Sequence, residues 1–487
     1  MTRRTRVLDD DPVASLDDYR RQRGMEALAG AIAVEPDVIV GLIADAGLRG
    51  RGGAGFPTGV KWRTVADNRS TEQATTVVVN GAEGEPGTFK DRTLLRVNPF
   101  KVLEGALIAA YAVRAGAVVV ALKATFEPEI DRVQRAIEDI AKSGLPGVLP
   151  IRIVTGPSEY LFGEESALLE VIEGRPPFPR VTPPYRRGLD EDEPWAGNSS
   201  SDVQLAARGG TDEAPTLVDN VETLANVPGI VLNGAAWFRS VGTAESPGTI
   251  VCTVSGATRW AGVGEYEMGT SLAEVIRELG GGALPQRSLV AALPGTANGA
   301  IAAADFDVAL SYESLAALGS GLGSAGFIVI DDSIDPVSVA HGVSRFLAIE
   351  SCGQCEPCKL DGLEISHGLR NIRTSTASEA DLALVERRLT TVSDEARCSV
   401  GPQHQVAVAS LLALASSSAA EHIARRIPGS EPWLVAPIID LVDGRVRLDP
   451  AQRSKQPDWG HDSDSGQTPA TRFENQPVSA LMGLASE

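Results

Sequence analysis

Residues 350–362 read ESCGQCEPCKLDG, and three cysteines recur in this stretch at every third position. They are Cys352, Cys355 and Cys358; Cys398 follows after a long gap, and the chain has one further cysteine, Cys252. A sequence that gathers four of its five thiols into one spaced set is typical of a protein that builds a metal centre.

Four thiolates can bind zinc or an iron–sulfur cluster. Structural zinc usually takes two separated C-x-x-C pairs, whereas this chain offers three cysteines together and one at a distance. That pattern favours one [4Fe–4S] cluster held by Cys352, Cys355, Cys358 and Cys398. A zinc site and unrelated thiols remain the alternatives. Unpaired thiols also fit a reducing compartment better than a secreted disulfide framework.

Composition narrows the class of protein further. At 487 residues the chain exceeds what one hydrophobic core usually serves, so about two to four domains are expected. The formal charge of −20 argues against nucleic-acid binding, which needs a basic face. The N-terminus MTRRTRVLDDDP has no apolar run behind it, and the apolar stretch 105–122 is interrupted by Arg114. We expect neither a secretory signal nor a membrane span, and a cytoplasmic protein that meets a membrane only through partners.

A glycine-rich stretch, GLRGRGGAGFPTGVKW, occupies residues 47–62 and has six glycines in its first thirteen residues. Glycines remove Cβ atoms where backbone must approach a ligand, and they free N–H groups to face anionic oxygens. Arg49, Arg51 and Lys61 add positive charge. The stretch predicts a site for a phosphate-bearing cofactor, with a merely flexible loop as the alternative.

Neither standard phosphate motif fits this stretch well. A G-x-G-x-x-G match exists at Gly50, Gly52 and Gly55, but residues 36–46 have helical periodicity where the dinucleotide fingerprint needs a strand. A P-loop is excluded because Val60, not lysine, follows Gly59.

Strands and helices alternate after the glycine-rich stretch. Strands are expected at 75–79, 117–122 and 151–154 and helices at 102–114 and 128–142, which predicts a parallel sheet in an α/β fold. The first strand runs into an acidic loop, NGAEGEPG, that begins at Asn80, and open α/β sheets place ligands at such strand ends. Residues 216–228, TLVDNVETLANVP, are expected to form a helix.

The pair Glu164 and Glu165 follows the third strand and has two interpretations. Acidic residues in the first turn of a helix are favoured by its dipole, so an ordinary helix start is one. The other is a pair of carboxylates that bind sugar hydroxyls or an amide.

The second half has a different character. Residues 248–332 suggest a compact α+β module, with Cys252 an ordinary buried thiol in its first strand and a helix within 265–282. Helical periodicity at 338–349, 361–372, 378–394 and 406–426 suggests a four-helix bundle. The predicted division is an N-terminal arm at 1–35, an α/β domain at 36–240 with an acidic mobile insertion at 186–214, the module at 248–332, the bundle at 336–426, a short hairpin at 427–450 and a disordered tail at 451–487.

One cluster carries one electron at a time, so the chain needs a partner for two-electron chemistry. A flavin supplies this because it accepts a hydride and releases electrons singly. The glycine-rich stretch and the acidic loop are where we expect it to bind.

Five stretches together resemble a known family. They are GLRGRGGAGFPTGVKW, NGAEGEPGTFKDR, EYLFGEESALLE, DNVETLANVP and ESCGQCEPCK with a later CSVG, in this order between residues 47 and 401. This set is similar to the NADH-binding flavoprotein subunit of respiratory complex I (the F subunit of NADH-quinone oxidoreductase) and to related subunits of soluble NAD-linked hydrogenases and formate dehydrogenases.

The resemblance implies a Rossmann-like α/β FMN domain, then a ubiquitin-like β-grasp (SLBB-type) α+β module, then an all-α four-helix bundle that carries the [4Fe–4S] cluster. It implies Glu83 and Glu165 as the carboxylates at the reacting centre. The residues implied for FMN are Gly50, Arg51, Gly52, Gly53, Lys61, Asn80, Tyr160, Gly163, Glu164, Asp219, Asn220 and Thr223. Those implied for the nicotinamide nucleotide are Phe56, Glu83, Glu85, Glu165 and Tyr185.

Four positions depart from the family pattern. Ala82 stands where the family has an FMN-contacting aspartate, and Thr64 where it usually has an aromatic residue beside the adenine. Thr182 replaces a lysine, and Asp219 replaces an asparagine. These changes concern the nucleotide entrance more than the cluster.

The leading hypothesis is an electron-transfer flavoprotein subunit, an NADH dehydrogenase or NAD-reducing module, that uses FMN, one [4Fe–4S] cluster and NAD(H). Its implied partners are a thioredoxin-like [2Fe–2S] subunit and a further iron–sulfur or catalytic subunit of the formate dehydrogenase or hydrogenase type. The alternatives are a flavin and iron–sulfur relay that no longer binds NAD(H), and a non-catalytic scaffold with structural zinc.

Overall fold

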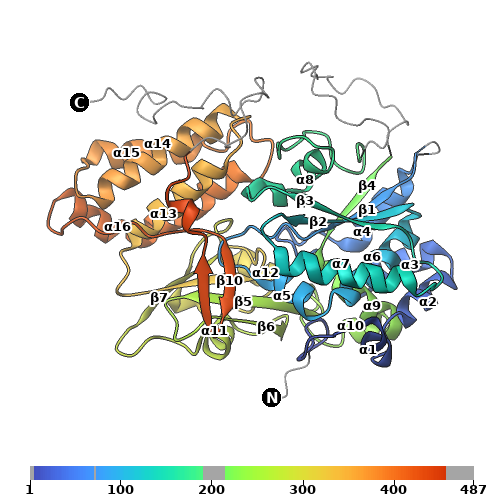
Figure 1. Ribbon diagram of the computed structural model, residues 1–487. Coiled ribbons are helices and arrows are strands. Elements are labelled where there is room, and N and C mark those ends of the chain that lie inside the picture. Colours follow the sequence, from blue (N-terminus) through green and yellow to red (C-terminus); the bar gives the residue numbers. More distant parts are fainter. Residues whose placement is uncertain (1–4, 71–72, 190–213, 457–487) are drawn as a thin grey trace.

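The computed structural model describes residues 5–70, 73–189 and 214–456 (Figure 1). The expected mobility of the acidic insertion at 190–213, and the expected disorder of residues 457–487, concern residues outside the described ranges.

The first half is built on a parallel sheet of four strands in the order β3-β2-β1-β4. Its central strands are rich in valine and buried, with Val77, Val78 and Val79 without exposed surface. Helices cover the sheet (Figure 1), which confirms the predicted α/β layer. The bounds are β1 Thr76–Asn80, β2 Ala117–Lys123, β3 Ile151–Gly156, β4 Thr216–Asn220, α3 Pro36–Ala46, α4 Thr58–Asp67, α5 Lys90–Val97, α6 Pro99–Val113, α7 Glu127–Lys142 and α8 Glu165–Ile172.

The start of the predicted helix at 216–228 is wrong. Residues 216–220 form β4, and α9 (Val221–Asn233) begins only after Asn220, whose side chain caps it. The β-branched start of this segment pairs in parallel with β1, and that pairing outweighs the helical pattern that follows it. Asn80 and Asn220 are consequently register partners at the carboxyl edge of the sheet.

The N-terminal 35 residues are more than an arm. They include α1 (Leu16–Arg21) and α2 (Glu26–Ile32), which bury Leu16, Tyr19 and Leu28 in the core of the first sheet. Upstream of them, the backbone N–H groups of residues 6–8 donate to the buried carboxylate of Glu265. The N-terminus is thus fastened to the second sheet.

The second sheet is mixed and has the strand order β6-β5-β9-β7-β8. Its bounds are β5 Thr249–Gly256, β6 Gly262–Glu267, β7 Leu289–Pro294, β8 Ile301–Ala302 and β9 Gly326–Asp331, with α11 Leu272–Gly280 and α12 Tyr312–Ala317 packed on it. The helix expected within 265–282 is too long, because residues 265–267 pair in β6 and Ser271 caps α11. The finer assignment to the β-grasp class stays a prediction.

Four helices follow, which confirms a helical C-terminal region: α13 (Pro336–Glu350), α14 (Glu356–Arg373), α15 (Glu379–Thr391) and α16 (Val400–Ile423). α14 and α16 each begin earlier than expected, directly after Cys355 and two residues after Cys398. Among the described helices, α16 alone is long and apolar enough to cross a membrane. It packs against α13, α14 and α15, and 33% of its most apolar window is buried.

Residues 427–456 form what we term the C-terminal strap, with β10 (Ile438–Val442), β11 (Arg445–Leu448) and η3 (Pro450–Arg453). The predicted hairpin around Asp443 is present. The strap accepts hydrogen bonds from all three parts. In the first half, Arg92 donates to the Ile438 carbonyl at 3.2 Å. The backbone N–H of Ala261 donates to the Gly444 carbonyl at 2.6 Å, and Arg345 of the bundle donates to the Gln452 carbonyl at 2.8 Å. Residues 451–456, expected in the disordered tail, are ordered because the bundle holds their carbonyls.

Candidate active site and thiol centre

The glycine-rich stretch forms a narrow loop beside the carboxyl edge of the first sheet. Gly50 N–H donates to the Phe56 carbonyl at 2.8 Å. A Cβ on Gly52 would lie 3.2 Å from the Asn220 Cβ, and Gly53 has a φ of +136° with no atom within 4 Å of such a Cβ. Bare backbone therefore faces open space next to Asn220. This is a cradle that any side chain would narrow, and it fits a flat or phosphate-bearing cofactor.

Arg51 and Tyr312 brace this loop from beneath. Arg51 N–H donates to Thr223 Oγ1 at 2.8 Å, and its buried guanidinium reaches the Tyr312 hydroxyl at 3.4 Å and the Pro247 carbonyl at 3.3 Å. Tyr312 donates in turn to the Gly50 carbonyl at 2.8 Å. Sequence reasoning missed Tyr312, because its role arises only when the second sheet packs on the loop.

Lys61 and Trp62, at the start of α4, reach the last residues of β4. Lys61 Nζ donates to the Val218 carbonyl at 2.6 Å and pairs with Glu165, while Trp62 Nε1 donates to Asp219 Oδ2 at 2.7 Å. Burial raises the pKa of Asp219 to about 6, although Lys61 and Trp62 act in the opposite direction. Burial alone would lower the pKa of Lys61, but Glu165 and Asp219 more than offset it, so Lys61 is cationic at neutral pH.

Glu83 lies at the N-terminus of α5. Its carboxylate accepts from the backbone N–H groups of Asp91 at 3.0 Å and Arg92 at 3.4 Å, where the helix dipole favours an acid. Burial, reinforced by Asp91 and opposed by Lys90, nevertheless raises the pKa of Glu83 to about 7. This carboxyl therefore changes charge in the neutral range.

Lys90 is fully buried among acids and holds Asn220 in place. Its Nζ lies 2.8 Å from Asp91 Oδ1, 2.9 Å from Glu222 Oε2 and 3.1 Å from Asn220 Oδ1. Asn220 Nδ2 donates to the other Asp91 oxygen at 2.7 Å. Burial lowers the pKa of Lys90, but the acids around it outweigh burial and raise it overall. Sequence reasoning missed Lys90, although a Lys-Asp pair at a helix start was a visible signal.

Glu85 and Tyr160 connect the first sheet to its neighbours. The Tyr160 hydroxyl donates to Glu85 Oε2 at 2.5 Å, and Thr296 Oγ1 donates to Glu85 Oε1 at 3.0 Å. Tyr160 N–H donates to Glu350 of α13 at 3.1 Å. Burial raises the pKa of both Glu85 and Tyr160. Both oxygens of Glu85 are thus engaged in holding the parts together.

Asn80 and the Gly163–Glu164 turn meet across the sheet edge. Asn80 Nδ2 donates to the Gly163 carbonyl at 2.9 Å, and a Cβ on Gly163 would lie 3.1 Å from the buried Ala82 carbonyl. Glu164 caps α8 by accepting from the N–H groups of Ser166 and Ala167 at 3.1 and 2.8 Å. The two carboxylates therefore have different roles: Glu164 caps the N-terminus of α8, and Glu165 forms an ion pair with Lys61.

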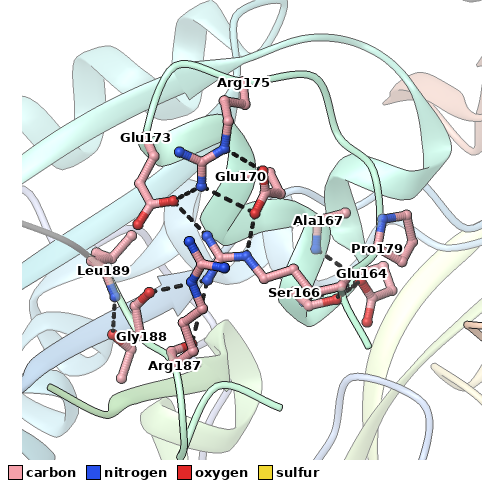
Figure 2. A network of polar contacts seen from close by, with 12 residues as sticks. Glu164, Ser166, Ala167, Glu170, Glu173, Arg175, Pro179, Arg187, Gly188 and Leu189 are labelled. Carbon is pink, nitrogen blue, oxygen red and sulfur yellow. Dashed lines mark hydrogen bonds and ion pairs between the residues drawn. The ribbon is translucent and has the colours of Figure 1, made fainter. Parts of the chain in front are cut away.

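A cluster of charges fastens the segment that follows α8 (Figure 2). Arg175 and Arg180 each pair with Glu170 and Glu173, and Arg180 also donates to the Gly188 carbonyl at 3.0 Å. This segment carries two of the residues expected at the nucleotide entrance, Thr182 and Tyr185. Tyr185 is half-buried, whereas Phe56, expected in the same pocket, has 53% of its surface exposed.

The four thiols gather where α14 and α16 begin. Cys352 and Cys358 are buried and Cys355 and Cys398 half-buried, all in or against one apolar core. Burial, with Cys352 adding to it, raises the pKa of Cys358 to about 12. The backbone N–H of Arg397 donates to Cys355 Sγ at 3.3 Å, and Gln354 Nε2 to Cys352 Sγ at 3.4 Å. Four sulfurs with N–H donors in an apolar surrounding are the donor set that an iron–sulfur cluster uses.

Zinc is the alternative metal for a set of four thiolates. Sulfurs around one zinc ion lie ~3.8 Å apart, because each Zn–S bond is about 2.3 Å. Across the described residues, no three histidine, cysteine or acidic side chains come close enough together to bind one metal ion. The arrangement of three cysteines together and one at a distance, in an apolar surrounding, is what favours a cluster.

The cofactor cradle and the thiols share one short segment, η1 (Tyr160–Gly163) with the start of α8. The Tyr160 hydroxyl lies 3.4 Å from Gln403 Oε1 on α16. Tyr160 and Cys398 both pack against one apolar core, which also contains Leu161 of η1. One segment therefore borders the first-sheet edge on one side and the thiol centre on the other.

A cradle at the end of a parallel sheet, joined through one segment to a four-thiol centre, defines the class of flavin- and iron–sulfur-containing electron-transfer subunits. Residues 43–229 match the Nuo51 FMN-binding domain, and residues 338–422 the NADH-ubiquinone oxidoreductase-F iron–sulfur binding region. The chain belongs to the family of NADH-quinone oxidoreductase F subunits. It is an oxidoreductase module of the NADH dehydrogenase type, with FMN and a [4Fe–4S] cluster as its cofactors.

Three similar proteins illustrate the family. The chain is 37% identical to NADP-reducing hydrogenase subunit HndC of Solidesulfovibrio fructosivorans, over 80% of this chain and 76% of the relative. It is 36% identical to an F subunit of NADH-quinone oxidoreductase from Rhizobium meliloti, over 79% of this chain and 89% of the relative. A chain of an NAD⁺-reducing [NiFe]-hydrogenase in its H₂-reduced state superposes with a TM-score of 0.71 and 31% identity, over 85% of this chain and 67% of that one.

Proposed function

We propose that this chain is the nicotinamide-side subunit of a multi-subunit oxidoreductase. The observation that carries the proposal is the shared η1–α8 segment, which contacts Asn80 at the cradle and packs into the same apolar core as Cys398. In this proposal, electrons pass from FMN at the cradle to the cluster at the thiol centre, and from there to a partner. Relatives named as subunits of complex I and of NAD(P)-linked hydrogenases support an iron–sulfur or catalytic partner subunit. A thioredoxin-like [2Fe–2S] subunit is our specific proposal.

Each side chain is assigned a role from its contacts. When bound, FMN supplies a centre that takes a hydride and gives up electrons singly. The loop at Gly50–Gly53 offers backbone, Lys61 a cation and Asn80 and Asn220 amides, while Arg51 and Thr223 fix the loop itself. Tyr160, Gly163, Glu164 and Asp219 shape the opposite wall.

The nicotinamide pocket is proposed on the exposed side of the same cradle. Phe56 and Tyr185 provide flat surfaces for the dinucleotide, and Glu83 and Glu165 are the carboxylates at the reacting centre. Hydride transfer needs positioning of the donor more than acid–base chemistry. Glu85, whose oxygens are both engaged by Tyr160 and Thr296, orients this pocket from its rim.

Anaerobic mixing with NADH tests the proposal. When NADH is added to the FMN-loaded protein, the absorbance band of the oxidised flavin is expected to disappear. Failure to bleach, with FMN still bound, would favour a relay that no longer accepts NAD(H), to which Ala82, Thr64 and Thr182 point. Iron and sulfide analysis tests the cluster independently: about four irons per chain are expected, and zinc in their place would favour the scaffold.

A further inference from the structure

A cleft outside both proposed sites lies between α13, α14 and the C-terminal strap, with a volume of about 440 Å³. Its cationic side chains come from three separate segments, namely Arg345, Arg370, Arg373, Arg453 and Lys455. No aspartate or glutamate lines it within the described part of the chain. In a protein with a formal charge of −20, such a gathering of one sign of charge focuses a positive potential.

Four of these five cations make no ion pair with a described residue, although Glu350 lies near Arg345, and Glu431 and Asp335 lie near Arg373. Arg345 donates to the carbonyl groups of Gln452 and Lys455, at 2.8 and 2.9 Å, so its guanidinium is held in place without a carboxylate. Arg370 and Arg453 are exposed and make no ion pair with any described residue. Lys455 pairs with Glu350 at 2.8 Å. The cleft thus combines an ordered guanidinium with free cations.

Two buried nitrogen atoms on its wall add an independent observation. His341 is 6% exposed and Arg373 7% exposed, yet His341 Nδ1 and Arg373 Nε have no hydrogen-bond partner among the described residues. Burial, and then the charges of Arg373, Arg345 and Arg370, lower the pKa of His341 to about 3. Its imidazole is therefore neutral and can donate one hydrogen bond. Leaving buried polar atoms unpaired is costly, and an oxygen-rich anion would satisfy both.

We propose that this cleft binds a phosphate-bearing anion. The planar guanidinium fork matches phosphate oxygens in a bidentate manner, which a lysine ammonium does not. Trp433 adds a flat apolar wall beside the cations, against which a base can stack, and the volume is in the range of small-molecule sites. The shared chemistry is a phosphate group, supplied by a nucleotide or by free phosphate or pyrophosphate. The site is separate from the proposed function, since none of its residues belongs to the cradle or the thiol centre.

Calorimetric titration of the full-length, cofactor-loaded protein with pyrophosphate tests the proposal. The double variant Arg370→Gln/Arg453→Gln removes two exposed charges of the cleft, and Arg20→Gln/Arg387→Gln removes two exposed charges elsewhere. Pyrophosphate is expected to bind the unaltered protein at one site, at least ten-fold more weakly to the cleft variant, and within two-fold of normal to the control. Equal affinity for both variants, or no binding to the unaltered protein at millimolar pyrophosphate, overturns the proposal. Flavin content is measured in both variants to confirm their folding.

Parallel titrations with AMP and inorganic phosphate identify the source of the phosphate. AMP binding more than ten-fold tighter than phosphate, with the difference lost in Trp433→Leu, supports the site as one for a nucleotide. If AMP and inorganic phosphate bind with similar affinity, and both bind more weakly to the cleft variant, the result supports a site for free phosphate. AMP binding that is unaffected in the cleft variant places the nucleotide elsewhere and contradicts the nucleotide form.

Discussion

Around Asn80 and Gly52, ligand-facing groups are backbone amides and side chains that already bond to one another. Around Cys352 and Cys398, four sulfurs lie in an apolar surrounding with few polar neighbours. In the cradle, polar groups are held by further residues, as Lys90 holds the Asn220 side chain and Tyr312 holds the Gly50 carbonyl. In the thiol centre the sulfurs have few protein partners, and under our proposal the cluster is the main partner of each.

This difference predicts two kinds of response to substitution. A cluster loses a full ligand when one cysteine is replaced, so function there fails in one step. The cradle spreads its binding over many small contacts, each worth about 1 kcal/mol, so function there declines in stages. The four predictions below test that contrast, starting with the largest expected effect.

Replacing Cys398 with Ser should abolish electron export while leaving the cradle intact. Iron and sulfide content should fall sharply because the fourth ligand is lost. The rate of electron transfer to one-electron acceptors should fall roughly ten-fold or more. FMN content and bleaching by NADH should be unchanged. Cys252→Ser, at a buried thiol of β5, is the control and should keep its iron. Full export in Cys398→Ser would show that the thiol centre is not the exit.

Replacing Lys90 with Met should be the most destabilising change in the cradle. It leaves Asp91 and Glu222 as buried carboxylates without their cation, and breaking a buried pair in this way typically costs about 3–5 kcal/mol. Denaturant unfolding measures the loss. Adding Glu222→Gln should recover part of it; a double variant no more stable than the single would contradict the proposed pairing.

Glu83 should make stability depend on pH near neutrality. Its pKa is raised to about 7 in the folded protein, from about 4.5, so the folded state binds the proton more tightly than the unfolded state. The resulting stabilisation is present below about pH 4.5 and is lost as pH rises towards 7, by at most about 3 kcal/mol since a pKa unit is worth about 1.4.

Unfolding measured between pH 5 and 8 should therefore show a decline in the native protein that is flatter in Glu83→Gln. The exposed Glu138, whose pKa is lowered by its hydrogen bonds with Gln134 and by Lys142, provides the matched control as Glu138→Gln. An identical pH profile for Glu83→Gln and the native protein would remove Glu83 as the titrating group.

Tyr312→Phe should give the smallest of the four effects. The loss of one hydrogen bond to the Gly50 carbonyl, worth about 1 kcal/mol, should weaken FMN retention by roughly five-fold. Fluorescence of released FMN measures this. Tyr111→Phe, which loses a bond to the Val34 carbonyl on the exposed surface, should retain FMN normally. A loss of all FMN in Tyr312→Phe would show that the loop depends on a single brace.

Local spacing in the sequence was enough to predict the thiol set, the glycine-rich loop and the alternation of the first sheet. These features depend on residues near one another in the chain. Tyr312 and the C-terminal strap could not be predicted in this way, because each acts on residues more than 250 positions away. β4 was missed for a related reason: five residues before a helix carry little pattern, and their pairing with β1 decides their structure.

The C-terminal strap also has a consequence for how the protein is made. Arg92 and Arg96 both pair with Glu129, but their contacts with the strap at 438–440 form only after those residues have been synthesised. Until then the three folded parts meet without this clasp. The contacts by which residues 427–456 join the three parts therefore form only after all three parts have been synthesised.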